Sequence, residues 1–577
     1  MTSKVPKVTA TEPGRQVRPG RFEADHPHYR WVALSNTTLG MLLATINASI
    51  VLISLPAIFR GIHLDPLEPA NVSYLLWMIM GFLVVSAVLV VMLGRLGDIY
   101  GRVRIYNLGF LVFALSSVAL SLDPLDQGAG AMWLIVFRVV QGVGGAMIFA
   151  NSTAILTDAF PADQRGMALG INNVAAVAGS FLGLVIGGVL AEWDWRAVFW
   201  VSVPLAILGT VWGVRSLREL GTRRTSGMDW WGNLTFAIGL TALLVAITYG
   251  IQPYGDHATG WSNPWVVSGL VGGVALLVAF VVIENRVTDP MFSMHLFRIR
   301  PFAAGNLAAL LAAISRGGMQ FMLIIWLQGI WLPLHGYDYE STPLWAGIYL
   351  LPLTVGFLVA GPVAGRLSDR YGARLFASVG LVLVAATYVG FLLLPVDFAY
   401  WQFAALLLVN GLASGLFAAP NATSIMNSVP ADQRGAASGM RGTFMNSGSA
   451  LSIGIFFSLM VAGLASSLPA SLRSGLTAQG VPGDVADQVA GLPSVGSLFA
   501  SFLGYNPIAT LLEPSGTLAA VSPDQAATLT GKQFFPALIS QPFHDGLVVV
   551  FLAAAVMSLV AAGASALTGA QYFHQDD

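Results

Sequence analysis

The sequence predicts an all-α membrane protein with fourteen membrane-spanning helices, and three observations support this prediction. The 577 residues are 55% hydrophobic and only 10% charged, with a mean hydropathy of +0.72. A soluble chain carries about a quarter charged residues, so most of this chain must have lipid as its solvent. Long apolar runs follow one another along the chain, and two loop motifs each occur twice. These runs are too long and too continuous for the strands of a membrane barrel, so they are predicted to be helices.

A helix needs about 20 apolar residues to cross a bilayer. Residues 1–30 and 570–577 lack such a run and are predicted to be tails, and the basic N-terminal tail does not resemble a cleaved signal peptide. The predicted spans are 31–59, 71–93, 104–122, 130–156, 167–191, 195–215, 230–251, 264–284, 302–332, 343–364, 373–395, 400–425, 435–463 and 546–569.

The basic residues predict that both termini are cytoplasmic. In this orientation 21 of the 28 lysines and arginines lie in the N-terminal tail or in cytoplasmic loops, and only four lie outside. This asymmetry is the positive-inside rule, and it agrees with an even number of spans. The remaining three basic residues, Arg138, Arg316 and Arg441, fall within predicted spans.

An internal repeat divides the chain into two halves. The hexapeptide PADQRG begins at Pro161 and again at Pro430, an offset of 269 residues. A second pair, GRLGDIYGRVR from Gly94 and GRLSDRYGARL from Gly365, has an offset of 271 residues. The agreement predicts two six-helix repeats in parallel arrangement, as found in transporters with a path between their halves. The halves are 31–215 and 302–569, and two additional helices lie between them at 230–284.

One long segment, 464–545, interrupts the second half on the outer side. It is rich in Gly, Pro, Ala and Ser, nearly free of charge, and its apolar pieces are too short to span a bilayer. We expect a loosely ordered surface loop. The alternative is a cap over the outer mouth of a transport path.

The repeated loop carries the first functional motif. Gly94-Arg-Leu-Gly-Asp-Ile-Tyr-Gly-Arg-Val-Arg104 resembles the signature loop of the major facilitator superfamily, G-x-L-x-D-x-x-G-R-x-R. Gly94 and Gly101 permit tight turns, and Asp98 suits a helix N-terminus, where partial positive charge favours a carboxylate. The resemblance implies the major facilitator fold and a latch between its halves. The implied latch residues are Asp98, Arg102 and Arg104 with their two glycines, and Gly365, Asp369 and Arg370 in the second copy.

Two further motifs resemble the same family. Arg138-Val-Val-Gln-Gly-Val-Gly-Gly-Ala146 matches its R-x-x-Q-G-x-G-x-A pattern, in which the arginine is implicated in proton movement, and Gln141 lies one turn away on the same face. An arginine at this depth also fits a purely structural role, satisfied by backbone carbonyls. On the fifth span, Gly183-Leu-Val-Ile-Gly-Gly188 resembles an antiporter motif whose proline is Leu184 here. Close packing of helices on Gly179, Gly183, Gly187 and Gly188 explains the glycines equally well.

The stretch Trp195-Arg-Ala-Val-Phe-Trp-Val-Ser-Val-Pro204 is similar to the start of the sixth span in the fourteen-span drug:proton antiporter subfamily, with Ser202 where asparagine is usual. The resemblance covers about 31–463 and 546–569. It implies a non-enzymatic transporter in the cell membrane that exports small amphiphilic drugs or metabolites by alternating access, driven by a proton gradient. No other cofactor, no metal and no nucleic-acid partner are expected; the partners expected are the lipid bilayer and the substrate, and the protein is expected to be a monomer.

One departure from the subfamily is the replacement of its first-span aspartate by Asn47, which cannot titrate. No Asp or Glu lies in the middle of a predicted span, so a proton acceptor would have to be Asp98, Asp158 or a carboxylate at a cavity mouth. An uncoupled facilitator, or an exporter of lipids or anionic metabolites, is therefore the alternative. The charges in the spans favour neutral, anionic or lipid-like substrates. Candidate cavity residues are Asn47, Asn172, Asn173, Gln320, Trp326, Gln328 and Asn446, with Arg138, Gln141, Arg316 and Arg441 as coupling or cavity residues.

Overall fold

The structure is a computed structural model that describes most of residues 28–569. The predicted tails, 1–30 and 570–577, lie outside the described residues apart from 28–30. Side chains within helices are not described at 72, 162–163, 165–166, 369 and 434–435. The described residues are 28–65, 68, 71–221, 229–252, 254–255, 257, 259–287, 290, 292–430, 433–504, 506–513 and 515–569.

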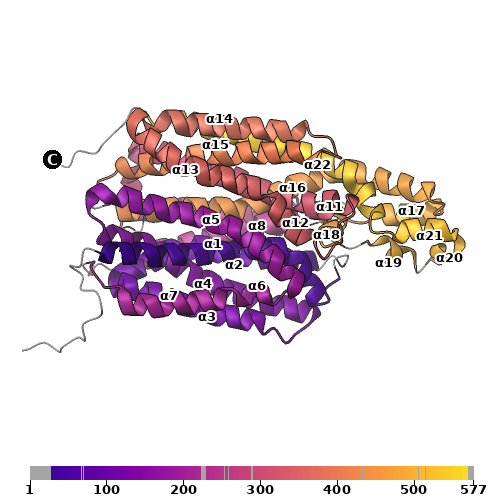
Figure 1. Ribbon diagram of the computed structural model, residues 1–577, viewed down its shortest axis with the longest axis horizontal. Coiled ribbons are helices and arrows are strands. Elements are labelled where there is room, and N and C mark those ends of the chain that lie inside the picture. The colour runs from indigo at the N-terminus through magenta and orange to yellow at the C-terminus, as the bar shows by residue number, and fades with distance from the viewer. Residues whose placement is uncertain are drawn as a thin grey trace, which may run out of the picture.

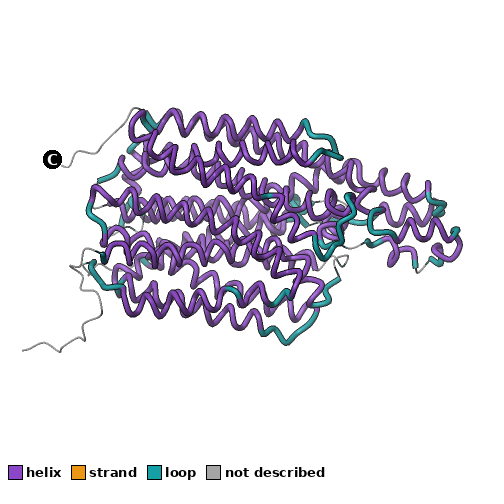
Figure 2. Tube along the Cα trace, in the orientation of Figure 1, coloured by secondary structure: helices purple, strands orange, loops and turns teal. Residues whose placement is uncertain are grey.

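Fourteen helices in this described part are long and apolar enough to cross a membrane, as the sequence predicts. The tube in Figure 2 is helical throughout the bundle, and only turns and short loops connect the helices. No extended strand forms among the described residues. The fold class predicted from the sequence is therefore confirmed, with six helices, two inserted helices and six helices in chain order.

The first half forms the lower layer of Figure 1, and its sixth span is split in two at Val201. The helices of this half are α1 (Tyr29–Gly61), α2 (Asn71–Tyr100), α3 (Arg102–Ser121), α4 (Gln127–Ala159), α5 (Ala162–Trp193), α6 (Ala197–Trp200) and α7 (Ser202–Ser216).

The second half forms the upper layer of Figure 1. Its first span contains a π-helical turn, η2 (Leu327–Trp331), between α10 and α11. The other helices of this half are α10 (Arg300–Trp326), α11 (Leu332–Leu334), α12 (Thr342–Tyr349), α13 (Leu351–Tyr371), α14 (Ala373–Leu392), α15 (Tyr400–Asn427), α16 (Arg434–Ala478) and α22 (Phe534–Ala566), preceded by the 3-10 helix η1 (Met294–Arg298).

The inserted helices α8 (Trp230–Gly250) and α9 (Pro264–Glu284) pack on each other and lie beside both halves. The hydroxyl of Thr248 on α8 donates to the sulfur of Met80 on α2 at 3.1 Å, and Gly454 on α16 faces Ile247 on α8. Asp229 caps α8 by accepting from the backbone N–H of Gly232 at 2.8 Å. These contacts place the inserted pair against the seam between the halves at α2 and α16.

The two copies of the loop motif have the same backbone turn. Gly101 and Gly372, at equivalent places in the repeat, have φ values of 114° and 90° and immediately precede α3 and α14. L-residues rarely adopt this conformation, which explains a glycine at both positions. We call the end of the bundle that carries these two glycines the motif side, at the left of Figure 1.

The opposite end, which we call the cap side, carries a helical projection at the right of Figure 1. The segment that we expected to be a loose loop is instead helical, because α16 and α22 both continue beyond the predicted spans. Buried apolar residues at a spacing of four join these extensions: Leu464, Leu468, Leu472 and Leu476 on α16, and Phe535, Ile539 and Phe543 on α22. Five short helices complete the projection: α17 (Gly483–Ala490), α18 (Ser494–Phe502), α19 (Ile508–Leu512), α20 (Thr517–Ala520) and α21 (Pro523–Thr530).

Small residues bring α5 close to α1. A Cβ added to Gly183 would lie 2.5 Å from the carbonyl oxygen of Ile46, and one added to Gly179 would lie 3.1 Å from that of Leu42. Gly187 meets Ile50 and Ile53 in the same way. The fifth-span glycines are therefore a packing surface for α1, as small residues commonly are between membrane helices.

We predict that Gly183→Leu destabilises the first half, because the new side chain would overlap the backbone of α1. Overpacking of this kind costs about 1–3 kcal/mol. Thermal unfolding of the purified protein in detergent should show a lower midpoint. Gly170→Leu on the same helix is the control, since nothing lies within 4 Å of a Cβ at that position. Equal midpoints for the two variants would contradict the packing account.

Candidate functional site: a cavity between the two halves

A cavity lies between the halves, in the motif-side part of the membrane-spanning region. Its empty space, including the open mouth, is about 1470 Å³. None of the described residues that line it is acidic, and two are arginines. It is lined from the first half by residues of α1, α2, α4 and α5, including Thr45, Phe82, Ser86, Thr153, Asn173 and Ser180, and from the second half by residues of α10, α13, α15 and α16, including Arg316, Phe357, Arg441, Met445, Asn446 and Ser449.

Direct contacts between the halves close the cap side. Gly188 at the cap-side end of α5 is packed against Leu344 and the carbonyl of Pro343 on α12, and Gly347 packs against Leu184. The amide of Gln328 on η2 donates to the carbonyl of Ile53 on α1 at 3.2 Å. These contacts separate the cavity from the cap side, so the path faces the motif side.

The cap contributes to this closure through α18, whose residues Ser494–Phe502 are nearly all buried. The hydroxyl of Ser501 donates to the carbonyl of Gly329 in the π-helical turn at 2.6 Å. The guanidinium of Arg60, at the end of α1, donates to the carbonyl of Leu503 at 3.1 Å. The C-terminal end of α18 and the residue after it thus bridge the two halves over the closed end.

The loop motif forms an ion-pair cluster within the first half. Arg102 contacts Asp98 at 2.7 Å and Asp158 at 2.6 Å, and about a quarter or less of each carboxylate side chain is exposed. Glu219, which the sequence reasoning missed, accepts from the backbone N–H groups of Arg102 and Arg104 at 3.1 and 3.0 Å. A carboxylate is favourable at these free N–H groups of the first turn of α3. The signal for Glu219 was an acid in an otherwise basic loop.

The second copy of the motif lacks a comparable cluster among the described side chains. Arg370 lies over the ring of Tyr371 at 5.3 Å, and Gly365 has only Ala419 near its Cβ position. The side chain of Asp369 lies outside the described residues. The two loops therefore share their backbone turn, and the ion pairs found among the described side chains belong to the first copy.

Arg138 is buried inside the first half, in a chain of neutral hydrogen-bond partners. Its guanidinium donates to the side-chain oxygen of Asn47 and to Gln141 at 2.8 Å. Gln141 in turn donates to Ser117 at 2.8 Å, and Asn47 donates to Ser202 at 3.1 Å. The two positions that depart from the subfamily, Asn47 and Ser202, are thus hydrogen-bonded to each other.

Phe82 lies between this arginine and the cavity. Its ring lines the cavity wall and faces the guanidinium carbon of Arg138 at 4.8 Å. No ion pair of Arg138 is found among the described residues, so its charge is stabilised by hydrogen bonds and by the aromatic ring. Arg138 and Gln141 act here as a buried network and not as part of the cavity surface.

The remaining candidate residues divide into two groups. Asn173, Asn446, Arg316 and Arg441 line the cavity, as the sequence suggested. The others lie elsewhere in this conformation. Asn172 donates to Ser152 at 3.3 Å inside the first half, Trp326 packs against Phe398 and Phe403, and Gln328 bridges the halves at the cap side. Asn47 belongs to the Arg138 network, and Gln320 is not among the lining residues.

Two pseudo-symmetric helical halves around a cavity that reaches only one side define a membrane transporter that works by alternating access. The family comparison agrees: the model of the Major Facilitator Superfamily matches residues 37–226 and 222–453, and the chain belongs to this superfamily. It is a transmembrane transporter and not an enzyme.

Named relatives cover most of the chain. The tetracenomycin C resistance and export protein of Streptomyces glaucescens is 27% identical over 93% of this chain and 91% of its own length. The methyl viologen resistance protein SmvA of Salmonella typhimurium is 29% identical over 78% of this chain and 86% of its own. Among solved structures, a bacterial homologue of the human lysosomal transporter Spinster, in an inward-facing and unoccupied conformation, has a TM-score of 0.55 at 17% identity, over 93% of this chain and 98% of its own.

We predict that Gly188→Leu forces the halves apart on the cap side, because the side chain would overlap α12. The chain has no cysteine, so spin labels can be introduced at chosen pairs. Trp193 and Leu393 form a cap-side pair with 83% and 80% exposure, and Tyr100 and Tyr371 form a motif-side pair. Double electron–electron resonance should show a longer distance between the cap-side labels and a shorter distance between the motif-side labels in the variant.

Gly272→Leu on α9 is the control, since a Cβ there meets nothing within 4 Å. It should leave both distance distributions as in the unsubstituted protein. Unchanged distances in Gly188→Leu would show that the contact between α5 and α12 does not determine which side is closed.

Proposed function

We propose that this transporter exports small amphiphilic molecules from the cytoplasm across the cell membrane. The observation that carries the proposal is the cavity between the halves, which is lined mainly by apolar and small polar side chains, as binding sites for small molecules usually are. The printed names of the tetracenomycin and methyl viologen relatives, which are resistance proteins, support export as the direction.

The motif side is cytoplasmic in this proposal, as the excess of basic residues in its loops indicates. Both termini then lie in the cytoplasm, and the conformation described is inward-facing. A substrate enters from the cytoplasm or the inner leaflet, the motif side closes, and the contacts of Gly188, Gln328 and Arg60 at the cap side separate. Each substrate needs one chain only, because both cavity walls come from the same chain, so we expect a monomer.

The cluster at the loop motif fits a latch that is released in this state. Asp98 and Asp158 both bind Arg102 within the first half, at the motif-side ends of α2 and α4. Closing the motif side brings this cluster toward the second half. A proton on either carboxylate weakens its pairing with Arg102, which makes these two acids the proposed site through which a proton gradient drives export.

A second candidate, an uncoupled facilitator, is favoured by the Arg138 network. In the described structure the partner of this arginine is the amide of Asn47, which has no proton to exchange. The two candidates differ in one measurable property: the proton-coupled exporter moves a proton with each substrate, and the facilitator does not.

We expect substrate-dependent proton release from inverted membrane vesicles energised to an acid interior. The recovery of a quenched pH dye after addition of neutral, anionic and cationic amphiphiles measures this release. Asp98→Asn should abolish this proton release, because the substitution removes the carboxylate for which Arg102 and a proton compete. Asp524→Asn, on the exposed surface of α21, is the matched control and should behave like the unsubstituted protein. Gradient-independent uptake of the same compounds, without proton release, would establish the facilitator instead.

We also predict that Asn47→Asp changes the response to pH. The substitution places a carboxylate against the Arg138 guanidinium, which is 1% exposed, and provides an ionisable partner within the membrane region. Transport by this variant should depend more steeply on pH than transport by the unsubstituted protein, measured as initial rates over a pH series. The same pH dependence in both proteins would contradict the inference that residue 47 limits coupling at this arginine.

A further inference from the structure

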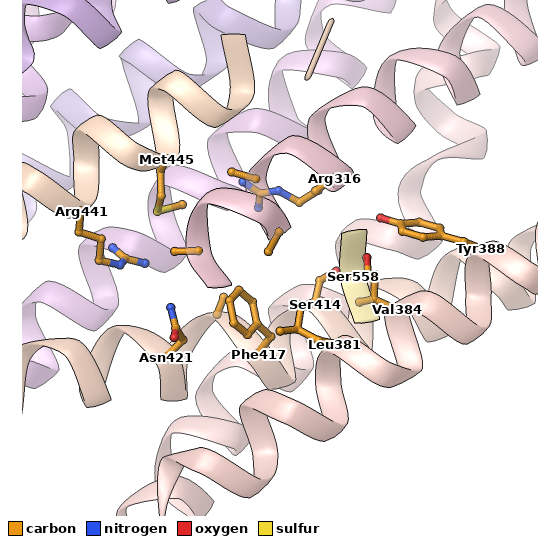
Figure 3. A pocket seen from close by; sticks show the side chains of 14 residues that line it. Arg316, Leu381, Val384, Tyr388, Ser414, Phe417, Asn421, Arg441, Met445 and Ser558 are labelled. Carbon is orange, nitrogen blue, oxygen red and sulfur yellow. The ribbon is translucent and has the colours of Figure 1, made fainter. Parts of the chain in front are cut away.

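Two arginines of the second half face the same space. Arg316 lies near the middle of α10, and Arg441 lies two turns into α16. Figure 3 shows their guanidinium groups pointing toward each other from opposite sides of a pocket, with Met445 and Asn421 nearby. Both residues also line the large cavity between the halves, so this pocket opens onto the transport path.

These two charges are unpaired among the side chains that the structure describes. No ion pair of Arg316 or Arg441 occurs among the described side chains, and the Nε atom of Arg441 is buried without a hydrogen-bond partner. An unpaired charge within a membrane-spanning segment is costly. A second positive charge facing it adds repulsion. An anion between the guanidinium groups relieves both costs, and arginine binds carboxylate and phosphate oxygens through parallel hydrogen bonds.

The wall beside the arginines is apolar. The pocket is lined by residues of the second half alone, and its empty space, including the open side, is about 550 Å³. At its far end the hydroxyl of Ser315 donates to Tyr388 at 3.1 Å and lies 3.1 Å from that of Ser558. The apolar lining residues are Ala309, Ala312, Ala313, Leu381, Val384 and Phe417.

We propose that Arg316 and Arg441 bind the head group of an amphiphile with one anionic group, such as a carboxylate, sulfate or phosphate ester, and that the adjoining pocket holds its apolar body. This inference rests on the proposed function, in that the ligand is the transported substrate. It names a charge opposite to that of methyl viologen, the dication in the name of the SmvA relative. The difference agrees with a cavity whose described lining contains arginines and no acid.

The same arrangement makes closure depend on the substrate. In the inward-facing state both arginines are only partly buried and face an open cavity that water can enter. Closing the motif side removes this water, and desolvating two like charges is unfavourable unless an anion accompanies them. Anion binding therefore favours the closed state, so that an empty transporter does not cycle in this account.

Binding of matched twelve-carbon probes to the purified protein in phosphatidylcholine nanodiscs tests the proposal. The probes are dodecanoate, dodecanol and dodecyltrimethylammonium, and isothermal titration calorimetry measures the binding of each. We expect dodecanoate to bind about ten-fold or more tightly than the other two, since charge-assisted hydrogen bonds are roughly twice as strong as neutral ones. Acetate should bind far more weakly than dodecanoate because it cannot fill the pocket.

The variants Arg316→Gln and Arg441→Gln should each remove the preference for dodecanoate over dodecanol. Arg441→Lys keeps the charge and should retain part of it. Arg374→Gln, at an exposed position at the start of α14, is the control and should leave the preference unchanged. Equal binding of the anion and the cation to the unsubstituted protein, or a preference that survives both glutamine substitutions, would overturn the proposal without reference to any variant's stability.

Two further experiments distinguish a lipid from a soluble anion, and the anion site from the proposed export. If phosphatidylglycerol in the nanodisc displaces dodecanoate, a lipid head group occupies the arginines; if it does not, a soluble amphiphile does, and both results support an anion site. Arginine-dependent binding of dodecanoate without its transport in vesicles would contradict the proposed export and leave the anion site standing. Transport of cationic amphiphiles alone would support the proposed export and contradict the anion site.

Discussion

The constraint on which this structure depends is the placement of three arginines in the membrane-spanning region without a carboxylate partner among the described residues. Arg138 is surrounded by amide, hydroxyl and carbonyl groups inside the first half. Arg316 and Arg441 instead face the cavity, where water or a ligand must satisfy them. A buried charge is tolerated only where it is hydrogen-bonded or solvated. Arg316 and Arg441 therefore require a cavity that admits water or a ligand.

Close helix packing determines the other end of the path. The glycines of α5 serve two purposes, since Gly179, Gly183 and Gly187 face α1 within the first half while Gly188 faces α12 of the second. The contact of α5 with α1 therefore stays within the first half, whereas its contact with α12 joins the two halves and must separate when the cap side opens. The hydrogen bond from Arg60 on α1 to Leu503 in the cap crosses the same seam, and Ser501 holds the cap against η2, so opening this side has to disrupt polar as well as apolar contacts.

Much of the fold could be predicted from the sequence, because each span is a long apolar run and the loop motif recurs with its glycine. Polar residues in a span usually face a cavity, which is why the sequence pointed to Arg316, Arg441, Asn173 and Asn446, and these four line the cavity between the halves. The helical cap was missed although Leu464, Leu468, Leu472 and Leu476 show its spacing, because we judged the segment by its composition. Trp326 and Gln328 were not separable from cavity residues, because which face of a buried helix meets a neighbour depends on the packing of both halves.

The most direct test of this account is to locate a bromine-labelled fatty acid, 12-bromododecanoate, in the protein by cryo-electron microscopy or anomalous diffraction. The account predicts density for the carboxylate between Arg316 and Arg441, with the bromine in the pocket lined by Leu381, Val384 and Phe417. If the bromine density lay in the first half and the two arginines were unoccupied, the claim that unpaired arginines define the substrate site would be contradicted.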